Sequence, residues 1–124
     1  MGTNGTGKVV VNLATGLEDP ERVTVAFLVA KAAAAAGNEV TMFLTKEAVR
    51  LALPGVAAGV ACDGCPPLAT VAGEFADAGG RLLACPVCFG ARKLDEDELL
   101  PHAQIGGATP LFQWIGAGAT VFSY

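Results

Sequence analysis

The sequence predicts an α/β fold in which helices cover both faces of a mostly parallel sheet. Short apolar runs rich in β-branched residues alternate along the chain with stretches that carry helix signals, an order typical of successive βαβ units. The apolar runs are continuous and do not alternate with polar residues, as expected for strands buried on both faces. Glycine and proline, 16 and 7 residues, mark the ends of most of these elements.

Five strands are expected, and turn residues bound most of them. The first is a valine-rich run that ends at Thr15-Gly16, and the third ends at a cysteine. The predicted strands are Val9–Leu13, Val40–Leu44, Arg81–Ala84, Ala103–Ile105 and Ala119–Tyr124.

The first helix has the clearest signals of the predicted helices. Asp19 is a favoured N-cap residue, Pro20 suits the first helical position, and Gly37-Asn38 provides the stop. Further helical segments are expected at Lys46–Leu53, Leu68–Ala78 and Pro86–Leu94, and from the Thr109-Pro110 pair through Ile115. The acidic group Asp95–Glu98 is expected to open another helix, because negative charge suits its amino end.

Composition restricts the class of protein. Apolar residues make up 52% of the 124 residues and charged residues only 16%, against roughly 25% in average chains. The eight basic residues are scattered along the chain, with only Arg92 and Lys93 adjacent, and the net charge is −4, so no nucleic-acid face is expected. The longest apolar stretch, Val23–Ala36, contains Thr24 and Lys31 and is too short for a membrane span. Because so few charges remain for the surface, we expect a homo-oligomer.

The chain is expected to form one domain over residues 1–124, with residues 1–7 as a flexible tail. The segment Gly2–Lys8 imitates the spacing of a phosphate-binding P-loop. Val9 stands where that loop needs serine or threonine, and a strand follows where it needs a helix. No apolar export segment is visible at the start of the sequence, which predicts a cytoplasmic protein.

The sharpest chemical feature is the pair Cys85 and Cys88, which follows the third predicted strand. Reactive groups in α/β folds collect beyond the carboxyl ends of strands. With Pro86 at the first helical position, Cys85 becomes the N-cap residue, where unpaired backbone N–H groups favour the nucleophilic thiolate. Cys88 lies one helical turn later and is a possible resolving thiol. An inert, packed pair is the alternative.

A second pair, Cys62 and Cys65, allows another reading. Residues 66–84 separate it from Cys85 and Cys88, which fits the spacing of four-cysteine zinc sites. The alternative function is therefore a non-catalytic oligomeric binding protein with structural zinc held by all four cysteines. A third possibility is that Cys62 and Cys65 are accessory thiols in a loop that exchanges with Cys85. His102, the only histidine, is interpreted as a solvated residue rather than a catalytic base.

The stretch from Cys85 to Leu99, CPVCFGARKLDEDEL, resembles the DsrE/DsrF-like sulfur-relay proteins, as do the element order and the ending ATVFSY. That family often has a cysteine after a strand, small residues, a basic residue, and then an acidic group before leucine. Here Lys93 stands where glycine is frequent, Cys88 stands where many members have a small residue, and the Cys62/Cys65 pair is not part of the pattern.

The resemblance implies a flavodoxin-like three-layer sandwich that assembles into trimers or hexamers. It also implies that Cys85 accepts a persulfide sulfur and passes it to a thiol of a partner protein, with Arg92 as a possible stabiliser of the anion. We therefore expect a sulfurtransferase-like sulfur carrier or a thiol-redox protein that needs no cofactor.

Overall fold

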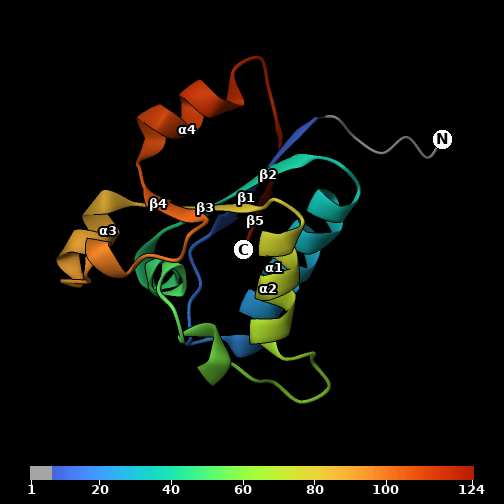
Figure 1. Cartoon of the computed structure of the whole chain (residues 1–124), viewed down its shortest axis with the longest axis vertical. Helices are drawn as coiled ribbons and strands as arrows, with labels where there is room; N and C mark the ends of the chain where they lie inside the picture. Colours follow the sequence, from blue (N-terminus) through green and yellow to red (C-terminus); the bar gives the residue numbers. More distant parts are fainter. Residues whose placement is uncertain (1–6) are drawn as a thin grey trace.

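Five parallel strands form one sheet in the computed structural model, which describes residues 7–124 (Figure 1). The strands follow the order β4-β3-β2-β1-β5 across the sheet, and every neighbouring pair is parallel. Their bounds are Lys8–Leu13 for β1, Glu39–Leu44 for β2, Arg81–Ala84 for β3, Ala103–Ile105 for β4 and Thr120–Ser123 for β5. The five predicted strands and the parallel sheet are therefore confirmed.

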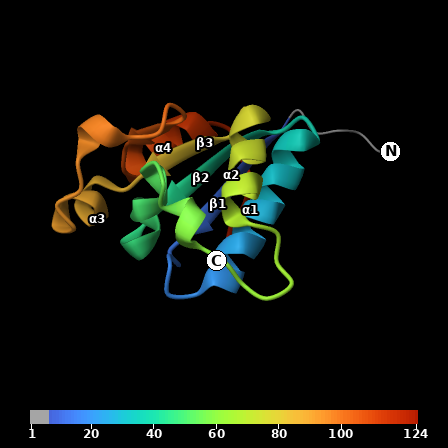
Figure 2. The same cartoon turned by 60° about the horizontal axis from the view of Figure 1, so that its bottom comes forward.

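Helices cover both faces of this sheet, as predicted. Helices α1 and α2 lie together on one face, and α4 lies alone on the other (Figures 1 and 2). The helices are α1 (Pro20–Ala35), α2 (Leu68–Asp77), α3 (Pro86–Ala91) and α4 (Ala108–Ile115), and the 3₁₀ helices are η1 (Lys46–Ala52), η2 (Ala57–Gly59) and η3 (Glu96–Glu98). The result is the predicted three-layer α/β sandwich.

The main core lies between the sheet and the α1–α2 face. Alternate residues of the central strands point into it, and Val11, Leu13 and Met42 are fully buried. A smaller cluster on the opposite face joins Val10 and Leu83 to Leu111 of α4. Because both faces of the central strands are buried, these strands need apolar residues at nearly every position.

The signals at the start of α1 act as expected. The Asp19 carboxylate accepts a hydrogen bond from the Arg22 N–H at 3.1 Å, and Pro20 occupies the first helical position. The helix ends at Ala35, and Gly37 takes a φ of +96° that favours glycine. The 16-residue helix therefore has the bounds that its flanking residues predict.

Two helix starts differ from the prediction. The acidic group gives only one 3₁₀ turn, because the Leu100 N–H bonds the Ala52 carbonyl at 2.9 Å and draws the chain back to η1. Helix α4 starts at Ala108 with Gly107 as N-cap, not at the Thr109-Pro110 pair. The preceding turn packs so tightly that a Cβ on Gly106 would lie 2.6 Å from Leu83 Cδ1, and the chain enters the helix directly from it.

Residues 1–6 lie outside the described part, and with them nearly all of the predicted tail and of the P-loop-like segment. The last tail residue, Gly7, is already paired with the sheet, since its carbonyl accepts the Glu39 N–H at 3.0 Å. No helix within residues 7–124 is both long and apolar enough to cross a bilayer.

Candidate functional site

Cys85 lies at the carboxyl end of β3 and is the N-cap residue of α3. Its N–H donates to the Leu44 carbonyl at 2.9 Å, and its own carbonyl accepts from the Phe89 N–H at 2.9 Å. Cys85 therefore makes the last hydrogen bond between β3 and β2 and accepts the first hydrogen bond of α3. Pro86 follows at the first helical position, where its missing N–H costs nothing. The predicted strand–Cys–helix junction is present.

The surroundings of Cys85 favour its thiolate. Burial of the half-buried side chain raises the pKa, but the backbone N–H groups of Cys88 and Val87 and the Cys88 thiol together lower the pKa below its ordinary value. The neutral sulfur makes no regular capping hydrogen bond. These donors therefore act chiefly on the charged form, as expected for N–H groups at the start of a helix.

Cys88 is the second free and half-buried thiol of this junction. It lies one turn along α3, and its side chain contributes to the lowered pKa of Cys85. The structure therefore brings together the two cysteines that the sequence pairs. Phe89, with 1% of its surface exposed, anchors the short helix in the core, whereas Val87 is 77% exposed next to the thiols.

The side chain of Arg92 is hydrogen-bonded to Glu47 and to the backbone of Cys88. Its Nε donates to the Glu47 carboxylate and its Nη1 donates to the Cys88 carbonyl at 3.1 Å. Arg50 also donates to Glu47, at 2.8 Å. Hydrogen bonds from Arg50 and Arg92 hold the pKa of Glu47 below its ordinary value. Arg92 thus links the end of α3 to η1 through a charge-assisted hydrogen bond to the Glu47 carboxylate.

Lys93 follows directly with a φ of +54°. This left-handed conformation favours glycine, the residue that is frequent at this place in the proteins that the stretch resembles. Lysine at this position in place of glycine therefore puts a local backbone strain at the end of α3.

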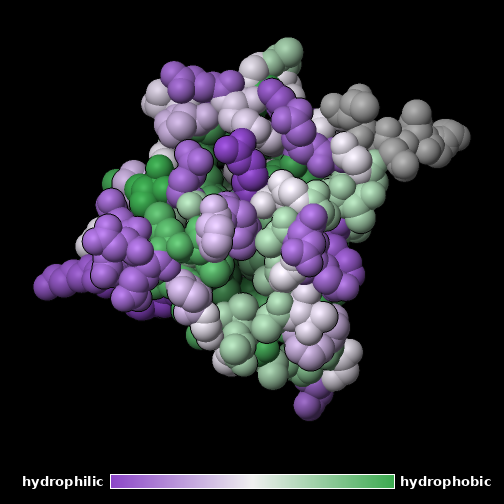
Figure 3. Space-filling model, viewed as in Figure 1, coloured by the Kyte–Doolittle hydropathy of each residue, from purple (hydrophilic) through white to green (hydrophobic). Residues whose placement is uncertain are grey.

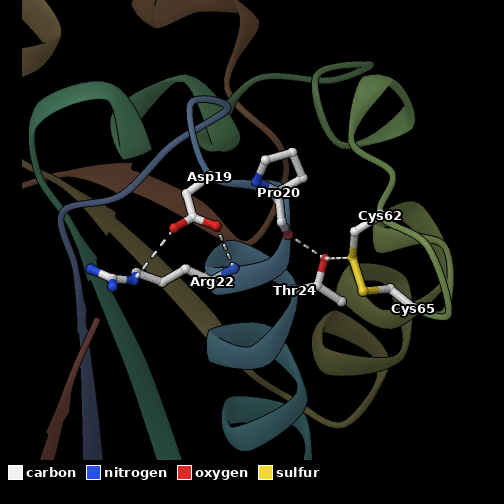
Figure 4. Close-up of a disulfide and its surroundings, with 6 residues drawn as sticks. All are labelled: Asp19, Pro20, Arg22, Thr24, Cys62 and Cys65. Atoms are coloured by element: carbon white, nitrogen blue, oxygen red, sulfur yellow. Dashed lines mark hydrogen bonds and ion pairs between the residues drawn. A yellow bond between two sulfur atoms is a disulfide. The ribbon is translucent and has the colours of Figure 1, made fainter.

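Cys62 and Cys65 form a disulfide in the loop between η2 and α2. Their Cα atoms are 5.3 Å apart, and the Cys65 N–H bonds the Cys62 carbonyl at 3.1 Å. Gly64 allows this turn with a φ of +76°. The Cys62 sulfur lies 3.9 Å from the Thr24 hydroxyl in the second turn of α1 (Figure 4).

The two cysteine pairs lie in different parts of the molecule, and this corrects two expectations. The loop of Cys62 and Cys65 runs beside α1 and α2, and α3 lies at the other side in both views (Figures 1 and 2). Within residues 7–124, no three cysteine, histidine or acidic side chains are grouped to hold a metal ion. The four cysteines are not grouped as the alternative zinc site requires, and the loop of Cys62 and Cys65 is not placed beside α3 to exchange with Cys85.

The histidine and the cavities do not belong to the cysteine site. Burial lowers the pKa of His102, which packs against the edge of Phe75. A cavity of about 220 Å³ lies between α2 and η1, where Figure 3 shows an apolar hollow. Another, of about 190 Å³, lies between α4 and the sheet. Neither cavity is lined by Cys85 or Cys88. Both thiols are half-buried and lie beside the exposed side chain of Val87.

Comparison with known proteins gives a family match over almost the whole chain. The model of the DsrE/DsrF-like family matches residues 8–124. The chain belongs to this family. No curated protein matches the chain.

Two solved structures share the fold of this DsrE/DsrF-like protein. The ychN protein from E. coli has a TM-score of 0.76 and 18% identity, covering 95% of this chain and 99% of its own. MTH1491 from Methanobacterium thermoautotrophicum, titled a protein of unknown function, has a TM-score of 0.72 and 16% identity, with the same coverage. At these identities the likeness concerns the fold alone.

Proposed function

We propose that this protein is a sulfur carrier that uses Cys85 as the sulfur-accepting thiolate. The observation that carries the proposal is the position of Cys85 at the carboxyl end of β3 and at the N-cap of α3, where the backbone N–H groups of Val87 and Cys88 lower the pKa of its thiol. The exposed surface of the junction gives a partner protein access to the thiol. Membership in the DsrE/DsrF-like family supports the same chemistry.

The transfer needs only thiol chemistry. The Cys85 thiolate attacks the outer sulfur of a donor persulfide, R–S–SH, and forms Cys85–S–SH, while the donor leaves as the thiolate R–S⁻. An acceptor thiolate then attacks the outer sulfur of Cys85–S–SH, takes it as a persulfide, and releases the Cys85 thiolate. Sulfur is passed on without net oxidation, and the N–H groups at the start of α3 stabilise Cys85 as nucleophile and as leaving group.

Cys88 is proposed as the resolving thiol. Its thiolate attacks the inner sulfur of Cys85–S–SH, forms a Cys85–Cys88 disulfide, and releases HS⁻. This step makes the site a thiol-redox centre when no acceptor is present, and two electrons from an external dithiol then restore the two thiols.

We also propose that the chain works as a homo-oligomer, a trimer or hexamer, in the cytoplasm. Exposed apolar side chains lie on α1, at Val25 and Leu28, and on the edge strand β5, at Val121 and Phe122. All four residues of β5 are exposed. A partner surface on this edge would cover both its apolar side chains and its free backbone groups.

The experiment is mass spectrometry after incubation with inorganic polysulfide as the sulfur donor. Trypsin cleavage at Arg81 and Arg92 yields the 82–92 peptide with both thiols of the site, and fragmentation separates Cys85 from Cys88. We expect one extra sulfur on Cys85, lost again when a small thiol is added as acceptor.

Two variants serve as controls for this experiment. Cys88→Ser should retain the sulfur on Cys85 for longer, because the resolving thiol is missing. Cys85→Ser should carry none. Extra sulfur that persists at Cys88 in Cys85→Ser would show that the wrong thiol has been assigned.

A further inference from the structure

The Cys62–Cys65 disulfide forms a second thiol site that the proposed sulfur relay does not use. We propose that it is a dithiol–disulfide exchange site, which accepts two electrons from a protein dithiol of the CxxC class. In this proposal Cys65 is the sulfur under attack and Cys62 is the leaving thiolate. The site is separate from Cys85 and Cys88, because α3, which carries that pair, lies across the molecule from the Cys62–Cys65 loop (Figures 1 and 2).

The first support is that a change at the disulfide is confined to its own loop. Val60 and Leu68, on either side of the loop, are 5% and 0% exposed and belong to the main core. The turn of the loop is also held by backbone atoms alone, through the Cys65 N–H to Cys62 carbonyl hydrogen bond and the positive φ of Gly64. The reduced loop therefore keeps its two thiols close together, and the bridge can open and close without unfolding the chain.

The second support is the different surroundings of the two sulfurs. The Cys62 sulfur lies 3.9 Å from the hydroxyl of Thr24, whereas Cys65 lies on the side of the bridge away from α1 (Figure 4). The Thr24 hydroxyl now donates to the Pro20 carbonyl at 2.8 Å. Because a hydroxyl rotates freely about its C–O bond, the same donor can turn to a thiolate on Cys62.

The charges around the loop do not compete for this role. Asp63, within the ring, is exposed, and Asp19 is paired with Arg22 at 3.7 Å on the neighbouring turn of α1. Thr24 is 1% exposed, so its hydroxyl is shielded from water and exchanges only its bond to the Pro20 carbonyl for one to the Cys62 thiolate. This makes Thr24 a positioning residue for the leaving sulfur.

The exchange balances as two successive thiol steps. A thiolate of the partner dithiol attacks the Cys65 sulfur, forms a mixed disulfide, and expels Cys62 as a thiolate, which takes a proton. The second thiolate of the partner then attacks the partner's other sulfur, which is bonded to Cys65 in the mixed disulfide. Cys65 leaves as a thiolate and also takes a proton. The chain gains two electrons and two protons, and the partner becomes a disulfide.

The test uses the full chain carrying Cys85→Ser and Cys88→Ser. Only Cys62 and Cys65 can then contribute thiols, so the result does not depend on whether the proposed sulfur relay is correct. Reduced thioredoxin serves as the protein dithiol. Alkylation followed by mass spectrometry counts the thiols over time, and acid quenching traps the mixed disulfide. We expect full reduction of the folded chain, reoxidation by an oxidised dithiol, an unchanged circular dichroism spectrum, and the mixed disulfide on Cys65.

Thr24→Val tests the positioning role, because valine keeps the shape and removes the hydroxyl. We expect its reduction to be about tenfold slower, the effect of one hydrogen bond to a charged leaving group. Thr70→Val, at an exposed position of α2, is the matched control and should react as the parent does. A bridge that opens only after unfolding, thiols that never pair, a mixed disulfide on Cys62, or equal rates for the two valine variants would each overturn the proposal.

Discussion

Removing the Cys62–Cys65 bridge should cost the protein a moderate and calculable amount of stability. The bridge closes a ring of four residues, from Cys62 to Cys65. In the chain-entropy treatment, closing so short a ring lowers the entropy of the unfolded chain by about 6 cal/mol/K, which corresponds to about 2 kcal/mol at 25 °C. The double variant Cys62→Ser/Cys65→Ser should therefore lose about 2 kcal/mol in the free energy of unfolding.

Urea denaturation of the parent, the reduced parent and the double variant measures this difference. We expect the reduced parent and the variant to agree in their free energies of unfolding. In thermal denaturation, their Tm should lie below that of the oxidised parent by roughly 6–12 °C. No loss would show that the bridge does not constrain the chain. A loss above about 4 kcal/mol would refute the reasoning in another way, because the loop ends at Val60 and Leu68 would then depend on the bridge for their burial.

Three further predictions concern the junction of β3 and α3. The pH at which Cys85 is half-alkylated by iodoacetamide should lie below that of an ordinary cysteine, and Cys88→Ala should raise it only in part, since the backbone N–H donors remain. An unchanged ordinary midpoint would contradict the site. Glu47→Gln should lower the free energy of unfolding at neutral pH. Since the folded state lowers the pKa of Glu47, the carboxylate stabilises the fold above the ordinary glutamate range, and parent and variant should converge as pH falls through and below that range. A gap that persists in acid would rule out the ion pair as its cause. Lys93→Gly should raise stability by up to about 1 kcal/mol in urea, because glycine relieves the left-handed strain, and a destabilised variant would refute this.

Local signals account for most of the fold. The valine-rich run of β1 and the Asp19-Pro20 cap act through neighbours in the chain, so the sequence alone predicts them well. Continuous apolar strands predict the parallel sheet for a similar reason, since burial on both faces leaves no room for polar positions. The start of α4 was missed because the close packing of Gly106 on Leu83 joins residues far apart in the sequence.

The site was predictable where it depends on one junction and not where it depends on long-range contacts. Strand, cysteine and proline in succession place Cys85 and Cys88 together. The spacing between Cys62/Cys65 and Cys85/Cys88 also fits a zinc site. Spacing does not determine where a loop lies in the fold, however, and here Cys62 lies against α1. Arg92 is paired with Glu47, which is 45 positions away in the sequence, and no local pattern indicates that partner.

The most direct test of the central claim follows a single sulfur atom. Full-length protein with Cys62→Ser and Cys65→Ser, which leaves the two thiols of the α3 junction, is incubated with polysulfide and then with an acceptor thiol. Mass spectrometry of the 82–92 peptide at each stage should show one extra sulfur on Cys85, followed by its appearance on the acceptor. A peptide that never gains sulfur on Cys85, or that gains it and cannot pass it on, would contradict a relay through this thiol.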